Sequence, residues 1–151
     1  MSDKPILCLD FDGVIHSYTS GWKGADVIPD AVTEGFFEWA ERAAQHFRLV
    51  IYSSRSKEPA GIAAMQAWFV EQRRHWREYE GGKHTIEAPL ELEFATEKPA
   101  AFLTIDDRGL TFNGNWRDEG WSPKRLLDFR PWYRRMDIID TVLPPVYAEQ
   151  A

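Results

Sequence analysis

The sequence predicts an α/β fold, specifically a three-layer α/β sandwich built around a mostly parallel sheet. Short, continuous apolar runs at 6–9, 49–52 and 101–105 have the pattern of strands that are buried on both faces of such a sheet. Segments with apolar residues at helical spacing lie between these runs, at 30–47 and 59–79. Buried strands that alternate with amphipathic helices are typical of parallel sheets joined by right-handed crossovers.

The length and composition are those of one globular domain. The chain has 151 residues, of which 44% are hydrophobic and 14% aromatic, enough for a single core over residues 1–151. A net charge of −6 argues against a general nucleic-acid binder. The single cysteine, Cys8, excludes an internal disulfide. No apolar run is long enough to span a membrane and the N-terminus lacks a signal-peptide pattern, so we expect a cytoplasmic protein with no membrane partner.

Two carboxylates follow the first predicted strand. Asp10 and Asp12 come directly after the apolar run 6–9, and Gly13 follows them. Residues i and i+2 of a strand point the same way, so both carboxylates are expected at the carboxyl end of the strand, where open α/β folds bind ligands. Adjacent carboxylates repel each other without a cation or a shared proton. The pair therefore predicts a metal or phosphoryl site, and the alternative is a surface turn that carries two acids.

A flap and a helix are expected after this strand. Residues 13–28 are rich in glycine, serine and aromatic residues, which favours a flap above the strand end. His16 lies within the flap and could contact a substrate. Asp30 is the predicted N-cap of a helix that extends to Phe47, with its apolar stripe facing the core.

Hydroxyl and arginine side chains follow the second predicted strand. Ser53, Ser54 and Arg55 lie between the apolar run 49–52 and a helix that has Pro59 in its first turn. Arg55 could bind a phosphate through its fork of N–H donors. It could equally be the structural partner of the nearby aspartates.

The third predicted strand also ends in carboxylates. Asp106 and Asp107 follow the buried run 101–105, and Arg108 comes next. For Arg108 the same two interpretations apply as for Arg55, contact with a phosphate or pairing with the aspartates. Since the ends of parallel strands share one edge of the sheet, these carboxylates are expected close to those of the first strand.

The remaining predicted elements are short. They are strands at 84–88 and at 90–94, the second of them partly exposed, an edge hairpin at 110–114, helices that begin at Pro123 and span 132–140, and a loose tail at 142–151. The segment before the tail is basic, and Trp116, Trp121 and Trp132 could stack on the bases of a nucleic acid. Packing of these tryptophans in the core is the favoured interpretation.

The order of the motifs resembles that of the haloacid dehalogenase (HAD) superfamily of phosphohydrolases. The four motifs of that superfamily are similar to Asp10-Phe11-Asp12-Gly13-Val14, the apolar run that ends at Ser53, Lys98-Pro99, and the apolar run that ends at Asp106-Asp107. The resemblance covers about residues 6–116. It implies a Rossmann-like sandwich, and because the gaps between the motifs are too short for a cap domain, it implies a small, capless member.

The resemblance also implies a catalytic mechanism. Asp10 would attack phosphorus and form an aspartyl-phosphate. Asp12 would be the general acid that protonates the leaving oxygen and then the general base that activates water. Ser53 and Lys98 would hold the oxygens of the transferred phosphoryl group.

The metal implied by the resemblance is Mg²⁺. It would bind Asp10, the backbone carbonyl of Asp12, and Asp106, and Asp107 would help directly or through a water molecule. Bound there, the cation would cancel the repulsion between the nucleophile and the phosphate.

Lys98 departs from the usual pattern of the superfamily in its position. Seven residues separate Lys98 from Asp106, fewer than is common between these two motifs. Lys57 or Lys83 could take its place, and Lys98 would then be a solvated surface charge.

The expected substrate is a phosphorylated molecule, small or macromolecular. Ser54, Arg55 and Arg108 are the predicted substrate-binding residues, and the segments that contain them are similar to those in phosphatase domains of polynucleotide-end-repair enzymes, so a nucleic-acid end is one possible substrate. The sequence leaves the oligomeric state open. The alternative function is a phosphoryl-accepting regulatory or binding module without efficient turnover. Asp12 argues for the enzyme, because a phosphoryl acceptor needs no carboxylate two residues further on.

Overall fold

A computed structural model describes residues 3–80 and 90–135. The chain divides into two compact units, Met1–Asp106 and Asp107–Ala151, and each unit is described by itself. The prediction of a single domain over residues 1–151 stays a prediction.

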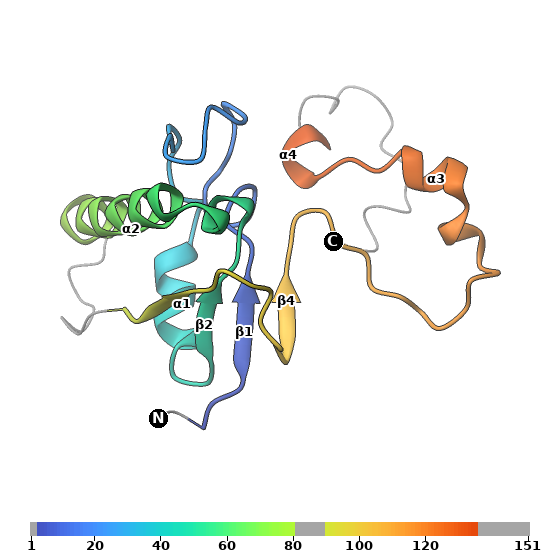
Figure 1. The fold of residues 1–151 in the computed structure, drawn as a ribbon, viewed down its shortest axis with the longest axis horizontal. Helices are drawn as coiled ribbons and strands as arrows, with labels where there is room; N and C mark the ends of the chain where they lie inside the picture. The colour runs from blue at the N-terminus through green and yellow to red at the C-terminus, as the bar shows by residue number, and fades with distance from the viewer. Residues whose placement is uncertain (1–2, 81–89, 136–151) are drawn as a thin grey trace. The chain divides into compact units, whose positions relative to one another are not determined.

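The first unit contains a four-stranded, entirely parallel sheet (Figure 1). Its strands are β1 (Ile6–Leu9), β2 (Arg48–Ile51), β3 (Leu92–Phe94) and β4 (Leu103–Ile105), in the order β3-β2-β1-β4. The predicted α/β class with a parallel sheet is confirmed. Leu9 pairs with both Ile51 and Ile105, so β1, β2 and β4 end at the same level. The residues that follow these strands therefore begin at one edge of the sheet.

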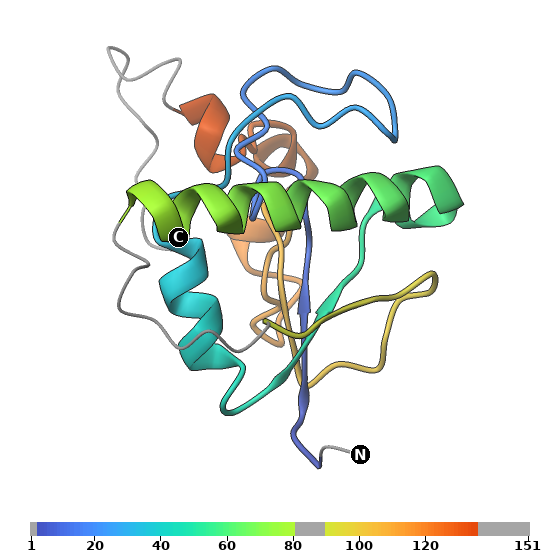
Figure 2. The same cartoon turned by 90° about the vertical axis from the view of Figure 1, so that its left-hand side faces the viewer.

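Two helices pack on one face of this sheet. They are α1 (Phe36–Ala43) and α2 (Pro59–Tyr79), and Figure 2 shows α2 crossing the strands. Alternate strand residues point to opposite faces, and one set forms a single core with the apolar stripes of both helices. This core includes the buried residues Leu9, Phe11, Phe37, Ile51, Met65 and Phe69. The rings of Phe11 and Phe69 contact each other edge to face. The predicted core stripe of each helix is confirmed except for Tyr79 at the end of α2, which was expected in the stripe and is 71% exposed.

Helix α1 spans only Phe36–Ala43, so the predictions that Asp30 is its N-cap and that it extends to Phe47 are wrong. The Asp30 carboxylate accepts hydrogen bonds from the backbone N–H (2.8 Å) and the hydroxyl (2.5 Å) of Ser20 in the flap. These bonds lower the pKa of Asp30 although burial acts to raise it. The helix instead follows Gly35, whose φ of 79° lies in the left-handed region that glycine tolerates.

Strand β4 was expected to be buried, and that prediction is wrong. Leu103 is 53% exposed and the preceding Phe102 is 73% exposed. The cause is the strand order, since among the described strands β4 is at an edge of the sheet and pairs with β1 alone. Strand β3 confirms the partly exposed strand predicted at 90–94, and the strand predicted at 84–88 lies outside the described residues.

The second unit is described over 107–135. The hairpin predicted at 110–114 is wrong, because this segment contains no strand. Instead the side-chain oxygen of Asn113 accepts a hydrogen bond from the indole N–H of Trp121 (2.9 Å) and its amide donates to Asp118 (2.8 Å). The helices are α3 (Pro123–Leu127) and α4 (Trp132–Arg135), which confirms the predicted starts. The predicted continuation to 140 and the tail at 142–151 lie outside the described residues.

No helix in the described part of the chain is long and apolar enough to cross a membrane.

The start of α2 packs tightly on the end of β2. Between them lies the short 3₁₀ helix η1 (Ser54–Lys57). Gly61, in the first turn of α2, lies so close to Arg55 that a Cβ atom on Gly61 would collide with the Arg55 carbonyl oxygen. Backbone atoms cannot move aside as a side chain can, so this contact requires a glycine.

The substitution Gly61→Ala tests this contact. Helix propensity alone predicts that it stabilises the protein by about 1 kcal/mol. Because the added methyl group overpacks the contact, we expect instead a loss of about 1–3 kcal/mol in the free energy of unfolding, measured by urea denaturation. The control Ala60→Gly, at the exposed neighbouring position, should lose only the propensity difference. A Gly61→Ala variant that is more stable than the wild type would contradict this packing.

Candidate functional site

Two aspartates meet at the carboxyl edge of the sheet in the first unit. Asp10 follows β1 and Asp106 follows β4, and the backbone N–H of Asp10 donates to the carbonyl of Ile105 at 3.0 Å. Each aspartate offers a carboxylate oxygen, and these oxygens lie within 4.8 Å of each other. The prediction that the ends of these strands bring carboxylates together is confirmed for this pair.

The donor set of this pair fits a hard divalent cation. Carboxylate oxygens are the ligands that Mg²⁺ prefers in proteins, and two carboxylates at this separation repel each other unless a cation lies between them. Asp10 is half-buried and Asp106 exposed, so water could complete the coordination. Asp10 also accepts a hydrogen bond from the backbone N–H of Phe11 (2.8 Å), which orients its carboxylate.

Asp107 belongs to the second unit. Its carboxylate accepts a hydrogen bond from the Tyr133 hydroxyl (3.0 Å), and the Arg108 guanidinium lies 3.8 Å from it. Arg108 also donates to the Tyr133 oxygen (3.2 Å) and is 63% exposed. Burial raises the pKa of Tyr133. Arg108 thus pairs with an aspartate, one of its two predicted interpretations, while Asp107 as a metal ligand stays a prediction.

The chain turns sharply after Asp10, and this turn separates the roles of the two aspartates of the first motif. The carbonyl of Phe11 accepts hydrogen bonds from three successive N–H groups, of Val14, Ile15 and His16 (3.2, 2.9 and 3.0 Å), and Gly13 has a φ of 80°. The Asp12 carboxylate is not part of the cluster around Asp10 and Asp106. Its backbone carbonyl as a metal ligand stays a prediction.

Two buried side chains bind the Asp12 carboxylate. His16 Nδ1 lies 2.8 Å from Asp12 Oδ1, and Arg55 Nε donates to Oδ2 and Oδ1 at 3.0 and 3.2 Å. The side chains of His16 and Arg55 are fully buried, whereas that of Asp12 is 13% exposed. Arg55 therefore has the second of its predicted roles, the structural partner of an aspartate, and the His16 side chain is buried rather than exposed in the flap.

The hydrogen bonds of His16 define its tautomer. Its Nε2 accepts a hydrogen bond from the backbone N–H of Asp30 at 3.1 Å, so in the neutral ring Nδ1 carries the proton and donates to Asp12. The sequence signal for this pair is the spacing Asp12-x-x-x-His16. This spacing brings the two side chains together only because the chain turns at Gly13.

Ser53 and Ser54 lie at the end of β2 as predicted. The Ser53 hydroxyl oxygen accepts a hydrogen bond from the Arg55 backbone N–H (3.2 Å), and the Ser53 N–H donates to the Ser56 hydroxyl (3.2 Å). This reciprocal arrangement is a capping box at the start of η1. Ser53 is buried and Ser54 exposed. The Ser53 oxygen acts as an acceptor here, and a hydroxyl group also carries a hydrogen that can be donated.

Lys98 lies in the segment between β3 and β4 and is exposed. Burial raises the pKa of the Cys8 thiol in β1, and a hydrogen bond with Thr104 lowers it; the charge of Asp10 raises this pKa and that of Lys98 lowers it. Lys98 is thus one of the charges that act on the Cys8 thiol. Its role as the phosphate-binding lysine stays a prediction, and Lys83 lies outside the described residues.

The tryptophans of the second unit are more exposed than predicted. Trp116 is 74% and Trp132 41% exposed, so their expected packing in the core is wrong. The rings of Trp116, Trp121 and Phe112 stack on one another with centroids 4.5–5.7 Å apart. Local stacking thus replaces burial in a core.

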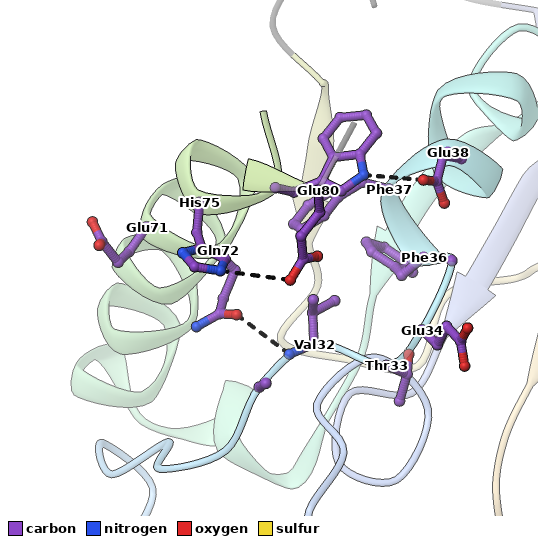
Figure 3. A pocket seen from close by; sticks show the side chains of 13 residues that line it. Val32, Thr33, Glu34, Phe36, Phe37, Glu38, Glu71, Gln72, His75 and Glu80 are labelled. Atoms are coloured by element: carbon purple, nitrogen blue, oxygen red, sulfur yellow. Dashed lines mark hydrogen bonds and ion pairs between the residues drawn. The ribbon is translucent and has the colours of Figure 1, made fainter. Parts of the chain in front are cut away.

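A cavity of about 560 Å³ lies between the segment 31–38 and α2 (Figure 3). Its lining carries four carboxylates, those of Glu34, Glu38, Glu71 and Glu80. None of the predicted site residues lines it, and its negative charge disfavours a phosphate. The predicted site is therefore not in this cavity.

Comparisons with protein-family models, with curated proteins and with solved structures found no match.

The aspartate pair predicts a response of stability to Mg²⁺. A ligand that binds only the folded state at a hundredfold excess over its Kd adds about 2.7 kcal/mol, several degrees in the unfolding midpoint. We expect millimolar Mg²⁺ to raise the midpoint of metal-free wild-type protein. Asp106→Asn should shrink this rise and should leave the metal-free midpoint unchanged or higher, because it removes a repulsion.

The control for this experiment is Glu91→Gln, the same loss of charge at an exposed position before β3. It should keep the full response to Mg²⁺, measured by calorimetry at neutral pH. A wild-type midpoint that Mg²⁺ does not move would contradict the site.

Proposed function

We propose that the protein is a magnesium-dependent phosphomonoesterase of the HAD type, with a capless three-layer sandwich, that acts through an aspartyl-phosphate. The observation that supports this most directly is the convergence of Asp10 and Asp106 at the level ends of β1 and β4, with carboxylate oxygens within 4.8 Å. This arrangement places the proposed nucleophile, Asp10, next to a second carboxylate, so that the two together could bind a hard cation.

The first half of the proposed reaction forms a bond to Asp10. A carboxylate oxygen of Asp10 attacks phosphorus while the bond from phosphorus to the leaving oxygen breaks, and Asp12 gives its proton to that oxygen. In the second half Asp12 takes a proton from water, which attacks phosphorus and releases inorganic phosphate and the free Asp10 carboxylate. Mg²⁺ held by Asp10 and Asp106 would supply positive charge that offsets the repulsion between carboxylate and phosphate.

The other proposed residues hold the transferred group. The Ser53 hydroxyl, at the end of β2, and the Lys98 ammonium would contact the phosphoryl oxygens. Ser54 is exposed and is proposed to contact the rest of the substrate, while substrate contact by Arg108, in the second unit, stays a prediction. Arg55 is omitted from this set because its side chain is fully buried against Asp12. The substrate class is a phosphate ester of a small molecule or of a macromolecule such as a nucleic-acid end.

One observation favours the second candidate, a phosphoryl-accepting module without efficient turnover. His16 and Arg55 both bind oxygens of the Asp12 carboxylate. Both halves of the proposed reaction need this carboxylate for proton transfer. A phosphoryl-accepting module needs only Asp10 and a cation. If the Asp12 carboxylate cannot leave His16 and Arg55, a phosphorylated Asp10 would therefore persist.

The substitution Asp10→Asn tests the nucleophile. An amide cannot form the aspartyl-phosphate, so we expect phosphate release to fall to the uncatalysed background while the unfolding midpoint stays near that of the wild type. Release is measured across phosphorylated metabolites, phosphopeptides and 3′- or 5′-phosphorylated oligonucleotides. The control Asp3→Asn, an exposed aspartate outside the site, should retain activity. Turnover by Asp10→Asn equal to the wild type would refute the covalent mechanism.

The substitution Asp12→Asn tests the proton transfer. On an alkyl phosphate, whose leaving oxygen needs a proton, we expect a loss of about 10²–10⁴-fold in the rate of the first step. On an aryl phosphate, which leaves without protonation, that step should lose far less. Rapid-mixing measurement of the released alcohol separates the first step from the hydrolysis of the aspartyl-phosphate. Equal losses in the first step on both substrates would argue against Asp12 as general acid.

A further inference from the structure

Arg55 is a buried cation that binds two different parts of the chain. Its Nε donates to the Asp12 carboxylate at 3.0 and 3.2 Å. Its Nη1 donates to three carbonyls of the flap, those of Gly24, Ala25 and Val27, at 2.7, 2.9 and 3.1 Å. One guanidinium, fully buried, therefore connects Asp12 to the flap.

His16 makes a second connection from Asp12. Its Nδ1 binds Asp12 at 2.8 Å, and its Nε2 accepts from the Asp30 N–H at 3.1 Å. The Asp30 carboxylate in turn binds Ser20 in the flap. Both connections start at one carboxylate, so the position of Asp12 and the position of the flap depend on each other.

One nitrogen of Arg55 is unused among the described residues. Nη2 is buried and has no hydrogen-bond partner there, although an arginine fork presents Nε and Nη2 on the same edge. Arg48 shows the complete fork, since its Nε and Nη2 bind the two oxygens of Glu93. Asp12 uses only Nε, so the second donor of that edge is left without an acceptor among the described residues. The ring of Trp22 in the flap, 50% exposed, covers the guanidinium at 4.7 Å.

We propose that Arg55 is a positioning residue that couples the flap to Asp12, holding the flap closed and the carboxylate in place with a single guanidinium. The spare Nη2 gives Asp12 a second paired orientation, in which one oxygen is released toward a bound phosphate ester. The part of this inference that concerns proton transfer rests on the proposed function. The part that concerns the flap does not.

Trypsin cleavage after Lys23 tests the coupling without any assay of activity. Lys23 is exposed and the next residue, Gly24, has its carbonyl held by Arg55. Cleavage requires the flap to open. We expect Arg55→Met to speed cleavage of the Lys23–Gly24 bond, followed by mass spectrometry, by about tenfold or more. Arg73→Met, which removes a largely buried arginine paired with Glu41, should leave the rate unchanged.

A second set of variants separates coupling from general destabilisation. Asp12→Asn should also speed this cleavage, and adding Arg55→Met to it should have little further effect, because the two residues act as one unit. If Arg55→Met does not fold, Arg55→Lys takes its place, since one ammonium cannot serve both Asp12 and the carbonyls. Cleavage after Lys23 at the wild-type rate in the folded Arg55 variant would overturn the coupling.

The role in proton transfer has its own measurement. Arg55→Met should lower the rate of the first step, measured by rapid mixing as released alcohol, by about tenfold or more on an alkyl phosphate and lower it far less on an aryl phosphate, with KM within about threefold of the wild type. A purely structural role would lower both equally, and that result would overturn the positioning role. A wild type that releases no phosphate would refute the proposed function, and the trypsin experiment would still decide the coupling.

Discussion

The pairing of Arg55 with Asp12 is the interaction on which the carboxyl edge of the sheet depends. Burying a guanidinium without hydrogen-bond partners would destabilise the folded state by several kcal/mol. The folded chain must therefore keep the acceptors of Arg55 next to it. Those acceptors come from the loop after β1 and from the flap, while Arg55 itself follows β2. The close approach of Gly61 to the Arg55 backbone attaches α2 to the same point. The pairing therefore fixes the flap, the loop after β1 and the start of α2 relative to one another.

The two aspartates of the first motif are stabilised in different ways. The sequence suggested that Asp10 and Asp12 repel each other until a cation binds. In the structure the positive charge for Asp12 is supplied by the chain itself, through Arg55, and the carboxylates that fit an external cation are those of Asp10 and Asp106. The sheet register produces this cluster, since Leu9 pairs with Ile105. Asp10 and Asp12 are thus two residues apart in the chain, but the sheet register brings Asp10 to Asp106, whereas burial of Arg55 determines its pairing with Asp12.

Features with local causes could be predicted from the sequence, and those with long-range causes could not. The apolar runs gave β1 and β2, and helical spacing with Pro59 gave α2, because burial and propensity act there within one segment. Asp30 had the residue type of an N-cap, but its partner Ser20 lies ten residues earlier. The exposure of Leu103 follows from the order of the strands, which no single segment encodes. Within the candidate site, Asp10 and Asp106 were predictable from strand ends, whereas the burial of His16 and Arg55 required the tertiary structure.

The contacts of Asp12 determine which of the two candidate functions the geometry permits. A carboxylate that stays on both His16 and Arg55 keeps its oxygens occupied, and a phosphorylated Asp10 beside it would be long-lived. Release of one oxygen normally costs a charge-assisted hydrogen bond, but here the Nη2 atom of Arg55 can replace the lost contact. In the proposed function, the balance between turnover and a persistent phosphorylated Asp10 would therefore depend on the free-energy difference between these two orientations of Asp12, which in our proposal the flap controls through Arg55.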